Sequence, residues 1–150
     1  MLKVNNLTVF YENAIAINKM SIDVCKDEIV GVIGPNSAGK TTLMNTISGL
    51  ILDTRLKENR KGGVRISTFG RVIFEGEDIT ELWPDKRVRK GIVLCRERHP
   101  VFGESSVEEN LKIAGYLRPR TDEKSSLDLV YEVFPKLHMM RKRKAGLLSG

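Results

Sequence analysis

The chain has 150 residues, of which 41% are hydrophobic and 29% are charged, and this is the profile of one ordinary globular domain. No apolar run approaches the roughly 18 residues that cross a bilayer, and the N-terminal segment lacks the apolar core of a signal peptide, so we expect a cytoplasmic protein. The net charge of +6, from 25 basic and 19 acidic residues, is compatible with an anionic ligand, a membrane surface or nucleic acid and selects none of them.

Neither the cysteines nor the densest basic run indicates a site. Cys25 and Cys95 are too few for a disulfide scaffold or a four-ligand zinc site, and both lie in apolar runs, where we expect each to behave as a small hydrophobe. The basic run 141–144 favours a solvated helix end over a nucleic-acid surface, because no aromatic residues are interleaved with it.

Apolar patterns in the first third of the chain predict strands and then a helix. Alternation predicts strands at 2–10 and 20–25. The run 29–33 is apolar without alternation, which is typical of a strand buried on both faces of a parallel sheet. A glycine-rich loop follows at 34–39, and helical spacing of apolar residues predicts a helix over 40–50.

The middle third alternates between polar and apolar segments. We interpret 52–63 as an exposed insertion or a frayed extension of the preceding helix. Two strands, 64–69 and 71–74, are expected to join at Gly70. A short helix over 84–90 starts at a proline.

The remaining segments predict one more strand and then helices. The apolar residues within 91–95 predict a second buried strand. Ser105-Ser106 with Glu108-Glu109 is a capping signal for a helix over 107–117. Further helices are expected at 127–134 and at 136–144, of which the second is basic. The order of elements indicates an α/β fold with a helical region at its C-terminal end.

The loop carries the strongest functional signal. Gly34-Pro35-Asn36-Ser37-Ala38-Gly39-Lys40-Thr41 fits G-x-x-x-x-G-K-[ST] at every fixed position. Glycines let the backbone approach a ligand closely, and successive N–H groups at a helix N-terminus form a phosphate nest. Lys40 would place a cation against the β- and γ-phosphates, and the Thr41 hydroxyl is a ligand that Mg²⁺ accepts. The sequence therefore predicts a nucleotide phosphate site.

The segments around this loop resemble those of the ATP-binding subunits of ABC transporters. Residues 34–43 look like the Walker A segment of that family, which more often has Gly at the position of Ser37. The turn 76–80, the segment 89–92 and the V-E-E-N-L of 107–111 are also similar to family segments. Leu148, Ser149 and Gly150 look like the opening of the signature L-S-G-G-Q. The ATPases of branched-chain amino acid importers are the most similar, because they often carry Glu at the Q-loop position, which is Glu97 here.

This resemblance implies a P-loop NTPase fold of the ABC-ATPase type. Residues 1–28 and 62–82 would form a mainly antiparallel β subdomain. Residues 29–51 and 90–104 would form a partial parallel-sheet core that binds ATP. Residues 105–150 would begin a helical subdomain that stops at the signature motif.

The resemblance also implies an ATP site with Mg²⁺. The residues expected to hold the nucleotide phosphates are Gly34, Asn36, Ser37, Ala38, Gly39, Lys40, Thr41 and Thr42. Tyr11 falls where the family has an aromatic residue that stacks on adenine, and its alternative role is to pack on the end of the sheet. Thr41 and Glu97 would lie near the metal, although Glu97 could instead be an exposed loop carboxylate paired with a neighbouring arginine.

The implied protein is an ATP-binding subunit of an importer for amino acids or similar polar solutes, on the inner face of the cell membrane. Its implied partners are a second ATPase subunit, arranged head to tail, and membrane permease subunits that contact the loop and helices after Glu97; no nucleic acid is expected. The Walker B and switch-histidine segments of the family fall beyond Gly150, so this chain is expected to bind ATP without hydrolysing it. The alternatives are a nucleotide-binding module without turnover and an ABC-type ATPase that acts on nucleic acid.

Overall fold

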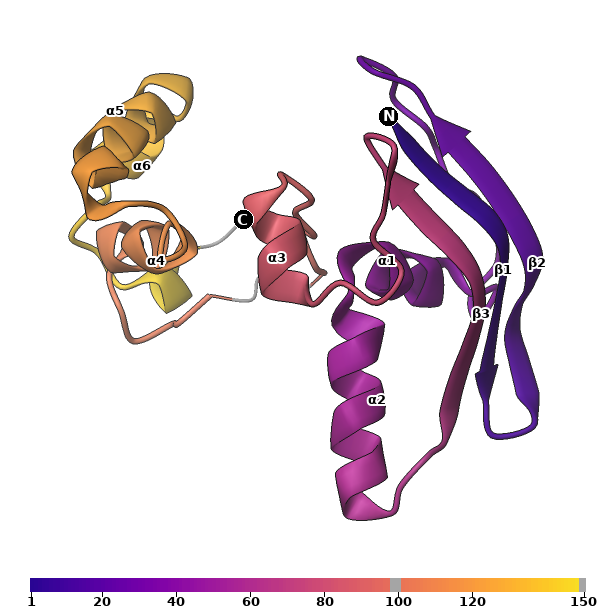
Figure 1. The fold of residues 1–150 in the computed structure, drawn as a ribbon. Coiled ribbons are helices and arrows are strands. Elements are labelled where there is room, and N and C mark those ends of the chain that lie inside the picture. The colour runs from indigo at the N-terminus through magenta and orange to yellow at the C-terminus, as the bar shows by residue number, and fades with distance from the viewer. Residues whose placement is uncertain (98–100, 149–150) are drawn as a thin grey trace. The chain divides into compact units, whose positions relative to one another are not determined.

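The computed structural model describes residues 1–97 and 101–148. The chain divides into two compact units, Met1–Leu94 and Cys95–Gly150, and each is described by itself. The first unit holds the sheet and the helices α1 to α3, and the second is helical (Figure 1). In the described part of the chain, no helix combines the length and the apolar character needed to span a membrane.

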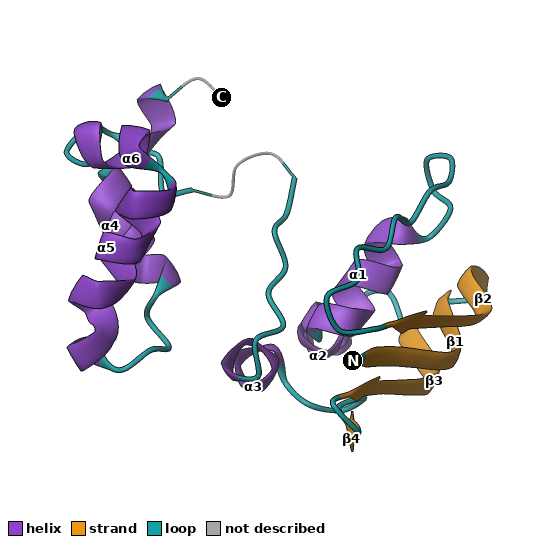
Figure 2. Cartoon of the chain, turned by 90° about the horizontal axis from the view of Figure 1, so that it is seen from above, coloured by secondary structure: helices purple, strands orange, loops and turns teal. Residues whose placement is uncertain are grey.

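The sheet of the first unit is antiparallel throughout. Its strands are β1 (Leu2–Tyr11), β2 (Ala14–Val24), β3 (Ile66–Phe74) and β4 (Glu77–Asp78). Figure 2 shows their order across the sheet, β2-β1-β3-β4. Strands β1 and β2 form a hairpin in which Tyr11 pairs with Ala14 and Leu2 pairs with Val24. The first predicted strand is therefore confirmed, whereas the second begins at Ala14 rather than Met20.

Strand β3 is continuous, although two strands joined at Gly70 were expected. Gly70 has a φ of 96° and lies beside an irregularity in the pairing of β1 with β3, between Asn5 and Thr8. A Cβ at this position would lie 2.6 Å from the carbonyl oxygens of both Asn5 and Asn6. Gly70 thus lies within one strand, opposite an extra residue of β1, and is not the junction of two strands.

The core of the first unit lies where β1 and β2 meet the first two helices. Helix α1 (Lys40–Ser48) and helix α2 (Leu50–Lys61) are joined at Gly49, whose φ is 83°. Both views place α1 beside the sheet (Figures 1 and 2). The buried members of the core are Val4, Leu7, Val9, Ile17, Leu43, Ile51, Leu52 and Ile66. The polar stretch 52–63 is therefore mostly helix, and the first turn of α2 anchors it in the core.

Two segments that were expected to be buried strands are not strands. Neither 29–33 nor 91–95 pairs with another segment in the described part of the chain. Ile29 and Ile33 are almost fully exposed, at 100% and 97%, and Val93 is 74% exposed. Both cysteines, expected to be small buried hydrophobes in these or neighbouring runs, are also exposed. A strand buried on both faces needs hydrogen-bonded neighbours, and without them the predicted parallel sheet is not formed in the described residues.

The helices after the sheet follow the predicted order with different ends. Helix α3 (Pro84–Arg89) starts at its proline as expected. In the second unit the helices are α4 (Val107–Ala114), α5 (Glu123–Val133) and α6 (Pro135–Met139), with 3-10 turns at Arg120–Asp122 and Ala145–Leu147. Helix α4 ends before the predicted residue 117, and α5 starts earlier than 127. The basic helix expected over 136–144 ends at Met139, so most of the basic run lies outside it.

The predicted capping signal of α4 is confirmed, and the residues that form the cap are Ser106 and Glu109. Ser106 Oγ accepts from the backbone N–H of Glu109 at 3.2 Å, and the Glu109 carboxylate accepts from the backbone N–H of Ser106 at 2.7 Å. These reciprocal bonds satisfy two N–H groups at the helix start. The Glu109 carboxylate accepts from both the backbone N–H and the hydroxyl of Ser106, and these two bonds hold the pKa of its carboxyl below the ordinary value.

Candidate phosphate-binding loop

The loop Gly34–Thr41 begins after the exposed segment 29–33 and ends in helix α1. The residues in its middle, from Pro35 to Ala38, are exposed, whereas Gly34, Gly39 and Lys40 are half-buried. A strand was expected before this loop and a helix after it. The helix is present, but the segment before the loop is not a strand. The loop therefore offers its backbone to solvent while its last residues are fixed against the protein.

Left-handed backbone positions shape the loop. Ser37 has a φ of 64° and Gly39 has a φ of 87°. A Cβ on Gly39 would lie 2.4 Å from the carbonyl oxygen of Ala16 and 3.2 Å from the Ile17 side chain, both in β2. Only glycine allows this approach. The second fixed glycine of the motif thus packs the end of the loop directly against the sheet.

The ammonium group of Lys40 lies against the loop itself. Its Nζ donates to the carbonyl oxygens of Gly34 and Pro35, each at 2.7 Å. The side chain therefore folds back from the first turn of α1 toward the start of the loop. Phosphate oxygens that approach the loop would meet a cation held by two neutral carbonyls, which are weaker partners than an anion.

The N-terminus of α1 is suited to an anion. No side chain caps it, and its first turn contains no acidic residue, so its N–H groups and positive dipole end have no competing carboxylate. Thr41 is exposed in this turn. No cluster of three acidic, histidine or cysteine side chains that could hold a metal occurs among the described residues. A Mg²⁺ ion would fit here through the Thr41 hydroxyl and phosphate oxygens, as it commonly does.

The structure brings together some of the predicted site residues and leaves others untested. Gly34 to Thr42 are consecutive residues of the first unit, and their contact with phosphate stays a prediction. Tyr11, at the end of β1 in the same unit, is half-buried and packs against the core, so its stacking on adenine stays a prediction.

The other predicted site residues belong to the second unit. Glu97 is exposed and its role beside the metal stays a prediction. Leu148 follows the last 3-10 turn and is half-buried. Ser149 and Gly150 lie outside the described residues. The predicted three-part division of the chain also stays a prediction.

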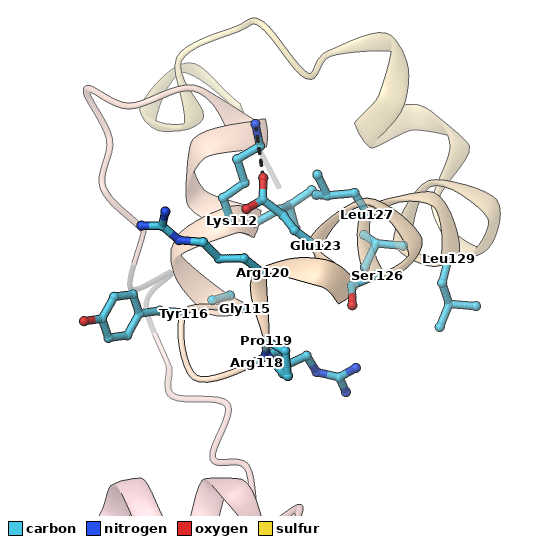
Figure 3. A pocket seen from close by; sticks show the side chains of 13 residues that line it. Lys112, Gly115, Tyr116, Arg118, Pro119, Arg120, Glu123, Ser126, Leu127 and Leu129 are labelled. Carbon is cyan, nitrogen blue, oxygen red and sulfur yellow. Dashed lines mark ion pairs between the residues drawn. The ribbon is translucent and has the colours of Figure 1, made fainter.

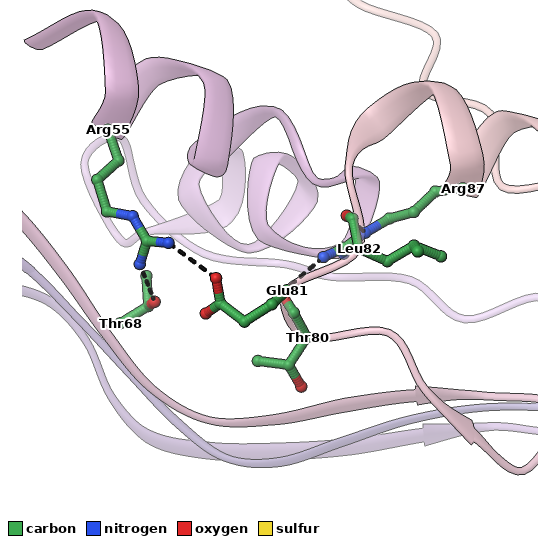
Figure 4. Close-up of polar contacts among 6 residues, drawn as sticks. All are labelled: Arg55, Thr68, Thr80, Glu81, Leu82 and Arg87. Carbon is green, nitrogen blue, oxygen red and sulfur yellow. Dashed lines mark hydrogen bonds and ion pairs between the residues drawn. The ribbon is translucent and has the colours of Figure 1, made fainter.

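Sequence reasoning missed a residue near the far end of α1. Arg87 of α3 is fully buried, and its guanidinium donates to carbonyl oxygens of α1. It also donates to carbonyl oxygens of the loop before α3 (Figure 4). Nothing in the sequence separates Arg87 from Lys86, its exposed basic neighbour. A short charged helix gives no signal of which cation is buried, because that depends on distant partners.

The second unit contains a pocket that no sequence motif indicated. It has a volume of about 450 Å³ and lies between the end of α4 and the start of α5 (Figure 3). Lys112 lies 3.6 Å from Glu123 across it and 3.0 Å from Glu108 within α4. The hydrogen bond and charge of Glu108 raise the pKa of Lys112. Lys112 is thus already paired with two carboxylates, and we assign the pocket no ligand.

Comparison with known proteins identifies one family and several relatives. The sequence model of a family described as ABC transporter matches residues 17–150. The chain is 35% identical over 150 residues to the probable branched-chain amino acid transport ATP-binding protein LivF of Archaeoglobus fulgidus. It is 33% identical over 150 residues to the high-affinity branched-chain amino acid transport ATP-binding protein BraG of Pseudomonas aeruginosa. Each alignment covers 100% of this chain and 58% of the relative, so the chain spans about 58% of the length of these relatives.

Solved structures of ATP-binding cassettes from the same family also match the chain. A nucleotide-free ATP-binding cassette from an ABC transporter matches with a TM-score of 0.73 and 28% identity, over 99% of this chain and 59% of that one. The ADP conformation of an ATP-binding cassette matches with a TM-score of 0.70 and 30% identity, over 100% of this chain and 59% of that one.

Proposed function

Since the chain belongs to the ABC transporter family, we propose that its loop Gly34–Thr41 binds the phosphates of ATP together with Mg²⁺. The observation that carries this proposal is the loop itself: a complete G-x-x-x-x-G-K-[ST] motif, exposed along its middle, that ends at the uncapped N-terminus of α1. The relative solved in an ADP conformation supports a nucleotide as the ligand.

Each part of the loop has a defined task in this proposal. The backbone N–H groups at the start of α1 donate to phosphate oxygens, in the favourable field of the helix dipole. The Lys40 ammonium exchanges its bonds to the Gly34 and Pro35 carbonyls for charge-assisted bonds to phosphate. The Thr41 hydroxyl helps to hold Mg²⁺, which neutralises phosphate charge. Tyr11 would offer a ring face to the adenine base.

For the whole protein we propose a subunit of an importer of branched-chain amino acids. The names of LivF and BraG support this substrate class. A second ATPase subunit and membrane permeases would be its partners, the latter through the region after Glu97, and its place would be the inner face of the membrane. An ATPase that acts on nucleic acid is not favoured, because the relatives compared above are named for transport.

Substitution of Lys40 tests the phosphate site. Lys40→Ala should leave the fold intact, because the loop is held by backbone geometry and by the contact of Gly39 with β2. We expect ATP affinity, measured by calorimetry, to fall by about 1.5–3 kcal/mol, the range for a hydrogen bond to a charged group. That loss is roughly a factor of ten to 150.

The matched control is Lys57→Ala. Lys57 lies on the exposed side of α2 and pairs with Asp53, so the variant removes the same charge away from the loop. ATP affinity should then stay within experimental error of the unmodified chain. Equal affinity in the Lys40 variant and the unmodified chain would contradict the assignment of the loop.

A further inference from the structure

Arg87 is a buried cation that makes no direct ion pair among the described residues, although the charge of nearby Glu81 favours its charged form. Its side chain is 0% exposed, and none of the ion pairs in the described part of the chain includes it. Burial lowers the pKa of its guanidinium to about 10, so the group remains charged at neutral pH. A buried charge is costly unless other groups replace its hydration. The surroundings of Arg87 must therefore supply that replacement.

Carbonyl oxygens from two segments replace the lost hydration. Nη1 donates to Thr46 at 2.7 Å and to Ile47 at 2.9 Å, both in the last turn of α1. Nε donates to Leu82 at 2.7 Å and Nη2 donates to Thr80 at 2.8 Å, both in the loop before α3. The last carbonyls of a helix lack partners within the helix and carry its negative dipole end. The guanidinium thus caps α1 and ties it to this loop.

The surrounding chain is shaped for this contact. Gly49, just after α1, leaves room for the guanidinium, since a Cβ there would lie 2.9 Å from Arg87 Nε. Thr80 is itself fixed to the sheet, because its hydroxyl accepts from the Val72 N–H at 2.9 Å. Glu81 pairs with Arg55 of α2 at 2.8 Å (Figure 4). We call the contacts of the Arg87 guanidinium with α1 and with the loop before α3 the Arg87 clamp. This clamp is connected to β3 through Thr80 and to α2 through Glu81 and Arg55.

Helix α1 carries the phosphate loop at its other end. The helix has 9 residues and starts at Lys40. It is held at its start by the contact of Gly39 with β2, at its middle by Leu43, which is 1% exposed, and at its end by Arg87. A short, regular helix behaves as a rigid rod over this length. Its orientation at the phosphate end therefore depends on where its C-terminal end is fixed.

We propose that Arg87 is a positioning residue of the nucleotide site: by fixing the C-terminal end of α1, it sets the orientation in which Lys40 and Thr41 meet the phosphates. This inference rests on the proposed binding of ATP by the loop. In this proposal Arg87 contributes to nucleotide binding as well as to the stability of the fold. Coupling between two sites is reciprocal, so bound nucleotide must also stabilise the contacts of Arg87 with α1 and with the loop before α3.

The variant that tests the proposal is Arg87→Lys. A lysine keeps the charge but cannot donate to both α1 and the loop before α3 in the planar geometry of a guanidinium. We expect the folded variant to bind ATP at least about fivefold more weakly, the lower end of typical coupling between sites. The control Lys86→Met removes an exposed charge from the same helix and should leave ATP affinity unchanged. Circular dichroism below the melting temperature confirms that each variant is folded before calorimetry.

A measurement on the unmodified chain keeps the proposal testable if Arg87→Lys does not fold. Saturating ATP should slow the solvent exchange of the Arg87 Nε proton and of the Gly49 amide, which donates to Thr46, as followed by NMR. Unchanged exchange at both protons, or a folded Arg87→Lys variant that melts earlier but binds ATP normally, overturns the proposal. If the unmodified chain binds no ATP at all, the proposed function fails instead, and the two failures are thereby distinguished.

Discussion

Two kinds of segment are rich in strand-forming residues, but only one of them forms strands. The segments of the antiparallel sheet are paired, whereas the apolar runs 29–33 and 91–95 are not strands in the described part of the chain. Strands β1 and β3 bury Val4, Val9 and Val72 almost completely, whereas Ile29 and Ile33 face solvent. The apolar character of the runs is at least as strong as that of the strands, so hydrophobicity does not explain the difference. What separates the two regions is the supply of hydrogen-bonding neighbours.

Each strand of the sheet has a hydrogen-bonded neighbour, and β1 has one on each edge. Strands β1 and β2 are joined by a turn at Glu12 and Asn13, and β1 then pairs with β3 on its other edge. The runs 29–33 and 91–95 have no paired neighbour in the part of the chain that the structure describes. A backbone cannot be buried with its N–H and C=O groups unpaired. An apolar run therefore predicts a buried strand only where a pairing partner is present.

Truncation of one apolar side chain in each region is the strongest test of this contrast. Leu7 is 2% exposed in β1, and Leu7→Ala should lower the free energy of unfolding by about 2–5 kcal/mol, through lost burial and a residual cavity. Ile33 is 97% exposed, and Ile33→Ala should change the free energy of unfolding by at most about 0.5 kcal/mol. Urea unfolding of both variants provides the measurement. A large loss in the Ile33 variant would mean that 29–33 is buried in solution.

Two glycines extend the same comparison to the backbone. Gly70→Ala places a Cβ 2.6 Å from the Asn5 and Asn6 carbonyls at a φ of 96°, and should cost about 1–3 kcal/mol. Gly31, in the apolar run, has open space around its Cβ position and no positive φ, so Gly31→Ala should be within about 0.5 kcal/mol of neutral. Thermal melts of the pair decide the matter. Similar losses in both variants would show that the run 29–33 is as constrained as the sheet.

Features set by neighbouring residues were predictable from the sequence. The loop 34–39 that leads into α1, the start of α3 at Pro84 and the cap of α4 each depend on residues a few positions apart. The family resemblance, and with it the α/β fold class of the ABC-ATPase type, is also confirmed by the matching family model and solved cassettes. These signals are local in sequence, and the structures that they specify do not depend on which distant segments pack nearby.

Features set by distant partners were not predictable. The burial of Arg87 depends on carbonyls of Thr46 and Ile47, far away in the sequence, and no pattern around Arg87 reports them. The continuity of β3 through Gly70 depends on the β1 backbone opposite it. The failure of 29–33 to form a strand depends on the lack of a pairing neighbour in the described residues. In each case the deciding contact is tertiary, and periodicity carries no information about it.

The smallest effect is expected at the local signal of the second unit, the cap of α4. Ser106→Ala removes the acceptor for the Glu109 N–H and should cost about 1 kcal/mol of helix stability, as loss of an N-cap side chain commonly does. Ser105→Ala is the matched control, because the Ser105 hydroxyl makes no hydrogen bond within the described residues. Amide exchange of α4, measured site by site, should quicken in the first variant and not in the second.

The same cap predicts a pH dependence with a definite sign. Hydrogen bonds from the backbone and side chain of Ser106 lower the pKa of Glu109 in the folded state. The stability that Glu109 contributes is therefore fully present above its unfolded pKa and is lost as the pH falls through its lower, folded pKa. In the unmodified chain, α4 amides should exchange faster on acidification than the intrinsic rate alone allows, and Glu109→Gln should flatten this acid limb. An acid limb that persists unchanged in Glu109→Gln would assign it to another carboxylate, and the cap would then hold α4 by hydrogen bonds that do not depend on the charge of Glu109.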